Sequence, residues 1–322
     1  MGIAREVVGI EIGGTKLQIV IGTDRGRILD RFRFDVDPGQ GAAAIRRQIE
    51  ITIGHLRSPK AQSAIGVGFG GPVDWRTGRI CCSHHVEGWS GFPFGAWLRE
   101  QSGLPVVVDN DANVAALAES HLGAGQGANP VFYVTLGSGV GGGLVVDGRV
   151  YHGATPGEAE IGHVRLDQSG ATVESRCAGW AVDRKVRAVK AAQPHGLLAR
   201  LVGQATCGEA KYLKAAIEQG DAPANTILRE TASDLAFALS HVIHLFHPEV
   251  IVLGGGLSLI GEPLRKAVLA ALPPCVMAAF QPGPDVRLAQ LSEDAVPIGA
   301  LVLGSAMPEL PPPQPHEMVG RE

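Results

Sequence analysis

Two glycine-rich turns, each set between two apolar runs, constrain the fold of this chain more than any other feature. Residues 8–16 read VGIEIGGTK and residues 134–143 read VTLGSGVGGG, and a further apolar run follows each turn. Glycine has no Cβ and accepts positive φ, so such a turn can bring bare backbone N–H groups close to an anion. One such turn is a common hairpin. Two, far apart in the sequence, predict two related half-domains that face a phosphate from opposite sides, as in a nucleotide-dependent phosphotransferase.

Size and composition favour a two-domain α/β enzyme in a reducing compartment. A length of 322 residues allows two compact domains that share a cleft, and 45% hydrophobic residues allow a full core. The net charge is −4, from 28 basic and 32 acidic side chains, and no basic cluster alternates with aromatic residues, so we expect no nucleic-acid partner. We expect no secretory signal and no membrane span, since no apolar run reaches about 18 residues. The five cysteines, with Cys81 and Cys82 adjacent, favour a reduced, cytoplasmic protein.

The hydrophobic pattern predicts two rounds of strands and helices. In the first round, strands at 7–12, 17–22, 28–34, 64–68 and 105–109 accompany helices at 42–56 and 94–101. This β-β-β-α-β-α-β order is typical of a ribonuclease-H-like half-domain. In the second round, strands at 131–136, 143–146, 149–151 and 250–253 accompany helices at 181–192, 208–219 and 224–246.

We therefore expect an α/β protein with two ribonuclease-H-like domains. The N-terminal domain takes residues 1–115, and a closing helix at 295–306 packs back on it. The C-terminal domain takes residues 116–294. Residues 307–322 are rich in proline, which cannot continue a helix, so we expect a disordered tail.

Glu11 is a carboxylate inside an apolar strand, two residues before the first pair of glycines. A buried, unpaired carboxylate is costly, so Glu11 should have a partner. It is either an edge-strand residue that faces water or a water-mediated ligand of Mg²⁺ on nucleotide phosphates. In the second case Thr15 supplies a hydroxyl and Lys16 a positive charge to those phosphates.

Asn110 and Asp111 directly follow an apolar strand and precede a helix-prone run. One interpretation is structural, because Asn and Asp are leading helix N-cap residues. The other is functional, because α/β sheets bind ligands at the carboxyl ends of their strands. An Asp at that place can take the proton from a substrate hydroxyl during phosphoryl transfer.

Glu160 and His163 lie three residues apart after the second glycine turn, so one helical turn or tight loop would aim both at one ligand. A carboxylate and an imidazole are both good partners for sugar hydroxyls. The alternative is a solvated loop with a capping glutamate.

Two weaker patterns lie further along the chain. Three glycines follow the strand 250–253, and they could let an adenosine approach the backbone, although alone they indicate only a turn. His241, His244 and His247 recur at every third position. The apolar residues between them favour a core-facing helix end over a metal site, so we leave them out of the predicted site.

Together these motifs resemble those of the ROK family (repressors, open reading frames and kinases), whose enzymes are ATP-dependent sugar kinases. The similarity runs from about residue 7 to about residue 306 and rests on EIGGTK at 11–16, GVGFGGPVD at 66–74, NDAN at 110–113 and EIGH at 160–163. It implies an actin-like fold with two domains around a central cleft, and Asp111 as general base. The implied sugar ligands are Gly71, Asn110, Asp111, Glu160, His163 and Glu174. The implied ligands of ATP and Mg²⁺ are Glu11, Gly13, Gly14, Thr15, Lys16, Gly137, Ser138, Gly139, Gly254, Gly255 and Gly256.

Two positions and one segment depart from the family pattern. The family usually has Asp where Glu11 stands and Ser where Ala178 stands. Most members also bind a zinc ion through the His of the sugar turn and three cysteines, but here residues 163–174 contain no cysteine and Cys177 lies beyond them. We predict no structural zinc, because a tetrahedral site needs four ligands. The order of that loop would then come from packing, with Trp180 as a contributor.

The resemblance thus implies a cytoplasmic kinase that moves the γ-phosphoryl group of ATP to a hexose hydroxyl, with Mg²⁺ as cofactor and a homodimer as assembly. Family repressors carry an N-terminal helix-turn-helix, and the early first strand here argues against DNA binding. Two alternatives stay open: a non-catalytic sugar sensor of the same fold, and a glucokinase that uses polyphosphate as donor. The sequence does not identify the sugar.

Overall fold

The computed structural model describes residues 5–55, 62–83, 86–157 and 159–306, and its strands form two five-stranded sheets and one hairpin. The first sheet contains β1 (Glu6–Ile12), β2 (Lys16–Thr23), β3 (Ile28–Asp35), β4 (Gln62–Phe69) and β7 (Val106–Asn110). The second contains β8 (Val131–Leu136), β9 (Val140–Val146), β10 (Arg149–Val150), β11 (Val250–Gly254) and β12 (Asp285–Leu288). The hairpin pairs β5 (Val73–Asp74) with β6 (Arg79–Ile80).

The two sheets share one topology. The first has the order β3-β2-β1-β4-β7, with β1 to β3 antiparallel and with β4 and β7 parallel to β1. The second has the order β10-β9-β8-β11-β12, with β8 to β10 antiparallel and with β11 and β12 parallel to β8. This repeat is the duplicated ribonuclease-H-like arrangement of an actin-like α/β protein, as the order of the expected elements indicates.

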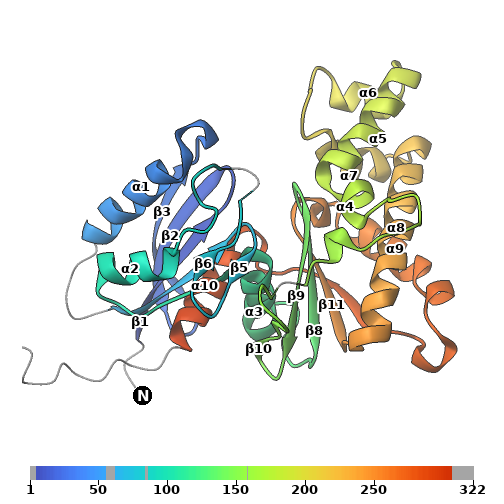
Figure 1. Cartoon of the computed structure of the whole chain (residues 1–322). Coiled ribbons are helices and arrows are strands. Elements are labelled where there is room, and N and C mark those ends of the chain that lie inside the picture. The colour runs from blue at the N-terminus through green and yellow to red at the C-terminus, as the bar shows by residue number, and fades with distance from the viewer. Residues whose placement is uncertain (1–4, 56–61, 84–85, 158, 307–322) are drawn as a thin grey trace, which may run out of the picture.

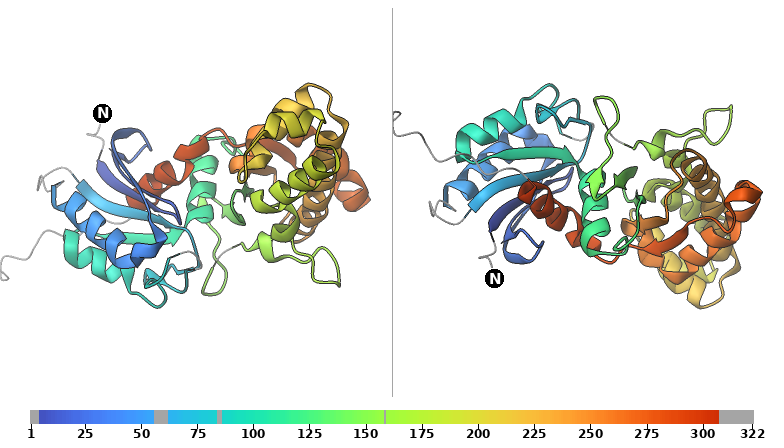
Figure 2. Two further views of the ribbon diagram at one scale, coloured as in Figure 1. Left: turned by 90° about the horizontal axis from the view of Figure 1, so that it is seen from above. Right: turned by 90° about the horizontal axis from the view of Figure 1, so that it is seen from below.

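Helices cover the sheets and connect them. The first half contains α1 (Gly41–His55) and α2 (Phe94–Ser102). The second half contains α4 (Val173–Cys177), α5 (Gly179–Ala192), α6 (Leu197–Val202), α7 (Leu213–Glu218), α8 (Ala222–Phe246) and α9 (Glu262–Ala271). Between the two sheets lie α3 (Asp111–Leu122) and α10 (Ala295–Ser305), as Figures 1 and 2 show from three directions.

Glycines let α3 and α10 approach the strands closely. A Cβ on Gly9 of β1 would lie 2.9 Å from the carbonyl oxygen of Pro297 in α10. A Cβ on Gly143 of β9 would lie 2.6 Å from the Cβ of Ala116 in α3. The last helix, α10, packs on β1 and β4 of the first sheet.

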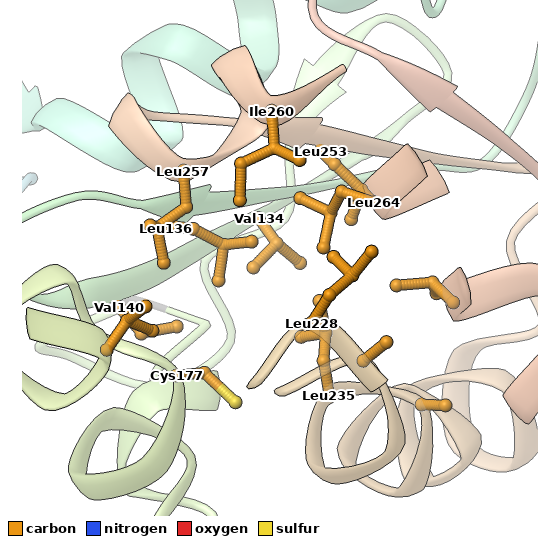
Figure 3. Close-up of a cluster of buried hydrophobic side chains, with 14 of the residues drawn as sticks. Val134, Leu136, Val140, Cys177, Leu228, Leu235, Leu253, Leu257, Ile260 and Leu264 are labelled. Atoms are coloured by element: carbon orange, nitrogen blue, oxygen red, sulfur yellow. The ribbon is translucent and has the colours of Figure 1, made fainter. Parts of the chain in front are cut away.

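The core of the second half is apolar and extends from β8, β9 and β11 to α8 and α9. Figure 3 shows Val134, Leu136 and Leu253 of the strands facing Leu235 of α8 and Leu264 of α9. The first half has a separate core between its sheet and the helices α1 and α2. Each glycine turn therefore projects from a sheet that is rigidly packed on one face.

Most expected strands and helices are confirmed, and a few elements differ. The short strands β5, β6 and β12 and the helices α4, α6 and α9 were not expected, and the helix expected at 208–219 divides into a 3-10 turn (Glu209–Tyr212) and α7. Because α3 contacts strands of both sheets, the domain boundary at residue 115 stays a prediction. Residue 56 and the proline-rich tail at 307–322 lie outside the described residues. Within the described part of the chain, no helix has the length and apolar character needed to cross a bilayer.

Candidate active site

The first glycine turn lies beside a second glycine loop and Asp111. The N–H of Gly13 donates to the carbonyl of Lys16 at 2.9 Å, which closes the turn between β1 and β2. The N–H of Gly70, in the loop after β4, donates to the carbonyl of Ile12 at 2.8 Å. A Cβ on Gly70 would lie 3.4 Å from Oδ2 of Asp111 and 3.6 Å from Cα of Gly13. The turn, the loop and the Asp111 carboxylate therefore meet at one point.

Glu11 has the partners that its place in the strand requires. Its side chain is 13% exposed, and its Oε1 lies 3.1 Å from Nζ of Lys16. Its Oε2 accepts a hydrogen bond of 2.6 Å from Nε2 of Gln18, which is fully buried. A plain water-facing carboxylate is therefore a poor description of Glu11. Lys16 is paired with Glu11, while Thr15 is exposed at the tip of the turn.

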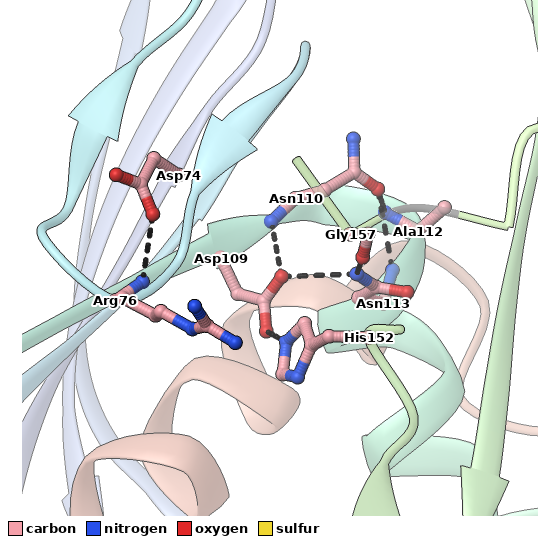
Figure 4. Close-up of polar contacts among 8 residues, drawn as sticks. All are labelled: Asp74, Arg76, Asp109, Asn110, Ala112, Asn113, His152 and Gly157. Carbon is pink, nitrogen blue, oxygen red and sulfur yellow. Dashed lines mark hydrogen bonds and ion pairs between the residues drawn. The ribbon is translucent and has the colours of Figure 1, made fainter. Parts of the chain in front are cut away.

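Asn110 ends β7 and caps α3, while Asp111 is the first helical residue. Oδ1 of Asn110 accepts hydrogen bonds from the N–H groups of Ala112 at 2.8 Å and Asn113 at 3.3 Å (Figure 4). Its Nδ2 donates to the carbonyl of Gly71 at 3.2 Å, which brings the loop after β4 to the start of α3. The N-cap interpretation is thus confirmed for Asn110, and the side chain of Asp111 is not the cap.

The surroundings of Asp111 raise the pKa of its carboxyl from 3.8 to about 7. Burial is the largest cause, followed by the negative charge of Glu11, and the charge of Glu160 adds to it. A hydrogen bond from the N–H of Ala112 acts in the opposite direction. A carboxyl group with such a pKa can accept a proton near neutral pH.

Glu160 directly precedes a 3-10 turn (Ile161–His163), and His163 is its last residue. Nε2 of His163 lies 3.9 Å from Oε2 of Glu160, and the two side chains are 74% and 44% exposed. The side chain of Glu160 makes no capping hydrogen bond, so Glu160 is not the cap, while the exposure of both side chains agrees with a solvated loop. Both groups are open to a ligand, and the negative charge of Glu160 contributes to the raised pKa of Asp111.

The second glycine turn joins β8 to β9. The N–H of Gly137 donates to the carbonyl of Gly139 at 2.9 Å, and Ser138 is exposed at the tip. The N–H of Gly179, at the start of α5, donates to the carbonyl of Gly137 at 2.7 Å. Like the first turn, this turn is closed by a hydrogen bond between its own backbone groups. The start of α5 packs against it.

The third glycine loop lies directly against the second turn. Gly254 ends β11, Gly255 has a φ of 79° that favours glycine, and Gly256 begins a 3-10 helix. A Cβ on Gly255 would lie 2.6 Å from backbone atoms of Leu136, the last residue of β8. The two glycine segments that the resemblance assigns to the nucleotide therefore form one surface.

The glycines that end the second motif have a packing role. A Cβ on Gly143 would meet Ala116 of α3, and a Cβ on Gly142 would lie 2.6 Å from the carbonyl of Ala159. These residues lie in β9, so they let α3 and the segment before the turn that carries Glu160 and His163 (the sugar turn) approach opposite faces of the strand.

Glu174 lies at the second glycine turn. Its Oε2 accepts a hydrogen bond of 3.0 Å from the N–H of Val140, and a Cβ on Gly139 would lie 2.8 Å from that oxygen. The carbonyl of Val140 packs on Gly162 of the sugar turn, where a Cβ would overlap it. Val140 therefore connects Glu174 to the turn that carries Glu160 and His163.

The segment at 163–174, which holds zinc in most family members, folds here as a short hairpin. Arg165 pairs with Thr172, and Oδ1 of Asp167 accepts hydrogen bonds from three groups within the turn. These hydrogen bonds order the loop. Trp180, which we expected to pack on it, is 43% exposed and lies under the guanidinium of Arg184.

A zinc ion does not fit these residues. Cys177 is fully buried in the core, where burial raises the pKa of its thiol to about 12 and keeps it protonated. Among the described residues, no three or more His, Cys, Asp or Glu side chains form a group that could hold a metal ion.

The three histidines of α8 do not form a site. We expected a core-facing segment, but all three are exposed and contact different partners. His241 contacts its own helix, His244 accepts a hydrogen bond from the N–H of Met277, and His247 stacks on Phe280. Of the residues between them, Val242 and Ile243 are buried, whereas Leu245 and Phe246 are exposed.

Sequence reasoning missed a polar cluster beside Asn110. Asp109, which is 2% exposed, contacts His152 and Asn113 (Figure 4). The available signal was an acidic residue at the end of the apolar strand β7. Nothing in the sequence pairs it with His152, which is 43 positions away.

Comparison with known proteins agrees with this architecture. The ROK family profile matches residues 7–306. The glucokinase of Halalkalibacterium halodurans is 32% identical over 309 residues, covering 92% of this chain and 93% of that protein. The glucokinase of Thermotoga maritima is 30% identical, covering 92% and 96%. A solved ROK family glucokinase from Streptomyces griseus, in complex with glucose and AMPPNP, superposes with a TM-score of 0.80 at 30% identity, covering 93% of this chain and 99% of that one. The chain belongs to the ROK family.

Proposed function

We propose that this chain is an ATP-dependent hexose kinase in which Asp111 is the general base. The observation that carries the proposal is the Asp111 carboxyl, with its pKa raised to about 7, at the point where the first glycine turn meets the Gly70 loop. The similarity to glucokinases over nearly the whole chain supports a hexose as acceptor. The complex of the Streptomyces griseus relative with AMPPNP supports ATP as donor.

Asp111 accepts the proton that the attacking sugar hydroxyl must lose. A sugar hydroxyl is a poor acid, and its proton must leave as its oxygen attacks the γ-phosphorus. The new O–P bond forms as the bond to the β,γ-bridging oxygen breaks, the proton goes to the Asp111 carboxylate, and ADP leaves. The rest of the rate enhancement comes from positioning and charge stabilisation.

The other hydroxyls of the sugar meet Asn110, Glu160 and His163. Asn110 uses one amide hydrogen on Gly71 and keeps the other for a ligand. Glu160 and His163 are exposed on the facing turn, and both accept or donate hydrogen bonds to hydroxyls. Glu174 reaches the same turn through Val140.

The two glycine turns and the Gly255 loop bind the nucleotide phosphates through backbone N–H groups. Mg²⁺ on nucleotide phosphates takes one or two carboxylates and otherwise water and phosphate oxygens, and Glu11 beside the first turn fits that role. The bound ion would neutralise phosphate charge. Lys16 then exchanges part of its contact with Glu11 for the phosphates.

We also propose that the protein is a cytoplasmic homodimer without a nucleic-acid partner. Leu245 is 74% exposed at the end of α8, and Phe237 and Phe246 on the same helix are more than 40% exposed. Such side chains offer apolar area to a second copy. The net charge of −4 gives nucleic acid no general attraction.

A coupled ADP-release assay against a panel of hexoses and amino sugars, with ATP and with polyphosphate as donors, tests the proposal. Turnover with ATP and at least one hexose is expected, with glucose as the first sugar to try. Sugar binding by calorimetry without turnover on either donor would instead support a sugar sensor. Turnover with polyphosphate alone would correct the donor.

A further inference from the structure

Asp109 and His152 join the catalytic segment to a loop of the other half of the molecule. Asp109 is the residue before Asn110 on β7, and His152 follows β10 of the second sheet. Nε2 of His152 lies 2.6 Å from Oδ2 of Asp109, and the two side chains are 15% and 3% exposed (Figure 4). The contact therefore joins the two halves at the residue that precedes Asn110, two positions before the proposed base Asp111.

The carboxylate of Asp109 is fully used. Its Oδ1 accepts hydrogen bonds from the N–H of Asn110 at 2.8 Å and from Nδ2 of Asn113 at 3.0 Å. Its Oδ2 accepts the hydrogen bond from His152. A buried carboxylate that loses one such partner is left with an unpaired oxygen, which is costly.

His152 also fixes the hairpin that follows the Gly71 loop. Its ring stacks on Trp75, with centroids 4.2 Å apart and an interplanar angle of 14°. Trp75 lies between β5 and β6, four residues after Gly71. Among the described residues its buried Nε1 has no hydrogen-bond partner, so its position depends on ring contacts, which are the stack on His152 and the guanidinium of Arg76 at 5.3 Å from the ring centroid.

A second hydrogen bond ties the same loop to α3. Nδ2 of Asn113 donates its other hydrogen to the carbonyl of Gly157 at 3.1 Å. Gly157 packs on His152, where a Cβ would lie 2.6 Å from the Cβ of His152. The loop from residue 152 to 157 is thus held at both ends, and the sugar turn with Glu160 and His163 follows it directly.

We propose that Asp109 and His152 are a positioning pair that sets the width of the sugar site. The imidazole is anchored on Asp109. Its stack on Trp75 fixes the hairpin that follows Gly71, and its place at the start of the loop 152–157 fixes the segment that leads to Glu160. The pair touches no substrate itself. The inference rests on the proposed function, because it takes Asn110, Asp111 and Glu160 as the sugar site.

Two substitutions separate the two contacts of the imidazole. His152→Phe keeps a ring to stack on Trp75 and removes the hydrogen bond to Asp109. His152→Gln keeps a side-chain N–H donor and removes the stack. We expect His152→Phe to raise the KM and Kd for the sugar about 10- to 100-fold, the size expected for a lost hydrogen bond to a buried charge, and to leave the KM for ATP within about twofold. His152→Gln, which keeps the hydrogen bond to Asp109 but no longer stacks on Trp75, should weaken sugar binding less than His152→Phe, through the hairpin after Gly71 alone.

His195→Phe, at an exposed loop position, is the matched control and should bind sugar as the wild type does. Calorimetry with sugar alone, together with the activity of the wild type, distinguishes a failure of the positioning pair from a failure of the proposed function. If the wild type phosphorylates a hexose and His152→Phe binds it normally, the pair has no positioning role. If the wild type phosphorylates no hexose, the proposed function fails instead.

A general loss of stability is distinguishable from a local one. Hydrogen exchange should accelerate at residues 152–157 of His152→Phe and at residues 73–80 of His152→Gln, and stay unchanged in α8 and α9 of both. Equal acceleration throughout, together with equal increases of the KM for sugar and ATP, would reduce the pair to an ordinary structural contact. Should His152→Phe not fold, His152→Gln and Asp109→Asn carry the same comparison, since Asn keeps an oxygen for the N–H of Asn110.

Discussion

Glu11 and Lys16 form an ion pair across the first glycine turn, with 3.1 Å between Oε1 and Nζ. Gln18 holds the other oxygen of Glu11 and accepts a hydrogen bond from Arg31, which in turn lies 2.6 Å from Asp294 before α10. The charge of Glu11 is thus fixed in place by the strand beside it. A phosphate that enters the turn meets a carboxylate and an ammonium whose positions are already set.

Glu11→Gln is expected to weaken the dependence on Mg²⁺ and lower turnover together. The amide of the variant must turn its NH₂ group toward either Lys16 or Gln18, both of which are donors. Glu11→Asp keeps the charge and should preserve activity. Titration of turnover with Mg²⁺ measures both effects, and Glu293→Gln, at a side chain 71% exposed, is the control. Full activity of Glu11→Gln would make Glu11 an ordinary strand carboxylate.

Asp111→Asn is expected to lower turnover about 10²- to 10⁴-fold, the usual contribution of general-base assistance. The amide keeps the shape of the side chain, and the cap of α3 is Asn110, so the sugar Kd should change little and the melting temperature should not fall. Turnover, calorimetry and thermal unfolding of the variant check these three expectations. Normal turnover of Asp111→Asn would contradict the assignment of Asp111 as general base.

The pKa of Asp111 predicts the pH dependence of the reaction. Only the ionised carboxylate accepts a proton, so kcat/KM for the sugar should fall about tenfold per pH unit below about 7 and level off above it. The residual activity of Asp111→Asn should not show this decrease at low pH. A pH profile that is flat between pH 5.5 and about 8 in the wild type contradicts the assignment.

The same pKa has a consequence for stability. The folded-state value lies above the ordinary value of 3.8, so the folded chain holds a proton that the unfolded chain has lost between these two pH values. The contribution of this group to the free energy of unfolding therefore falls as the pH rises from about 4 to about 7 and stays low above. Relative to the wild type, Asp111→Asn should gain stability over that range, which denaturant unfolding at pH 5 and about 8 measures.

Local patterns in the sequence predicted the parts of the fold that have local causes. The strands β1 and β8 and the long helix α8 follow from apolar periodicity, and the glycine turns follow from glycine chemistry. The strand β12 has only one buried residue, Val286, and exists because β11 offers its edge. The Asp109–His152 contact and the partners of Glu174 join residues distant in sequence, so they depend on the whole fold.

The hairpin in place of the zinc loop should be independent of metal. Three hydrogen bonds to Asp167 order it, and Ser169 holds the pKa of that carboxyl below its usual range. Metal analysis of protein purified without chelator should find far less than one zinc per chain. Chelator should leave the melting temperature unchanged. One tightly bound zinc per chain would overturn the prediction.

Glu174 contacts the second glycine turn directly, and it contacts the turn that carries Glu160 and His163 through Val140. One substitution of Glu174 can therefore affect both turns. Its Oε2 accepts the N–H of Val140, whose neighbour Gly139 belongs to the phosphate turn and whose carbonyl packs on Gly162. Glu174→Ala removes the acceptor and should raise the KM for both sugar and ATP. Glu174→Gln keeps one oxygen for Val140, so it should preserve the KM for ATP and raise that for the sugar, which loses a charged partner.

Steady-state kinetics with each substrate varied in turn measure this pattern, with Glu218→Ala at an exposed position as control. A carboxylate that only bound sugar would give a normal KM for ATP in both variants. A carboxylate that only held the turn would give a normal KM for the sugar in Glu174→Gln. The expected split, with sugar affected in both variants and ATP in Glu174→Ala alone, requires that Glu174 contacts the sugar and anchors the turn at the same time.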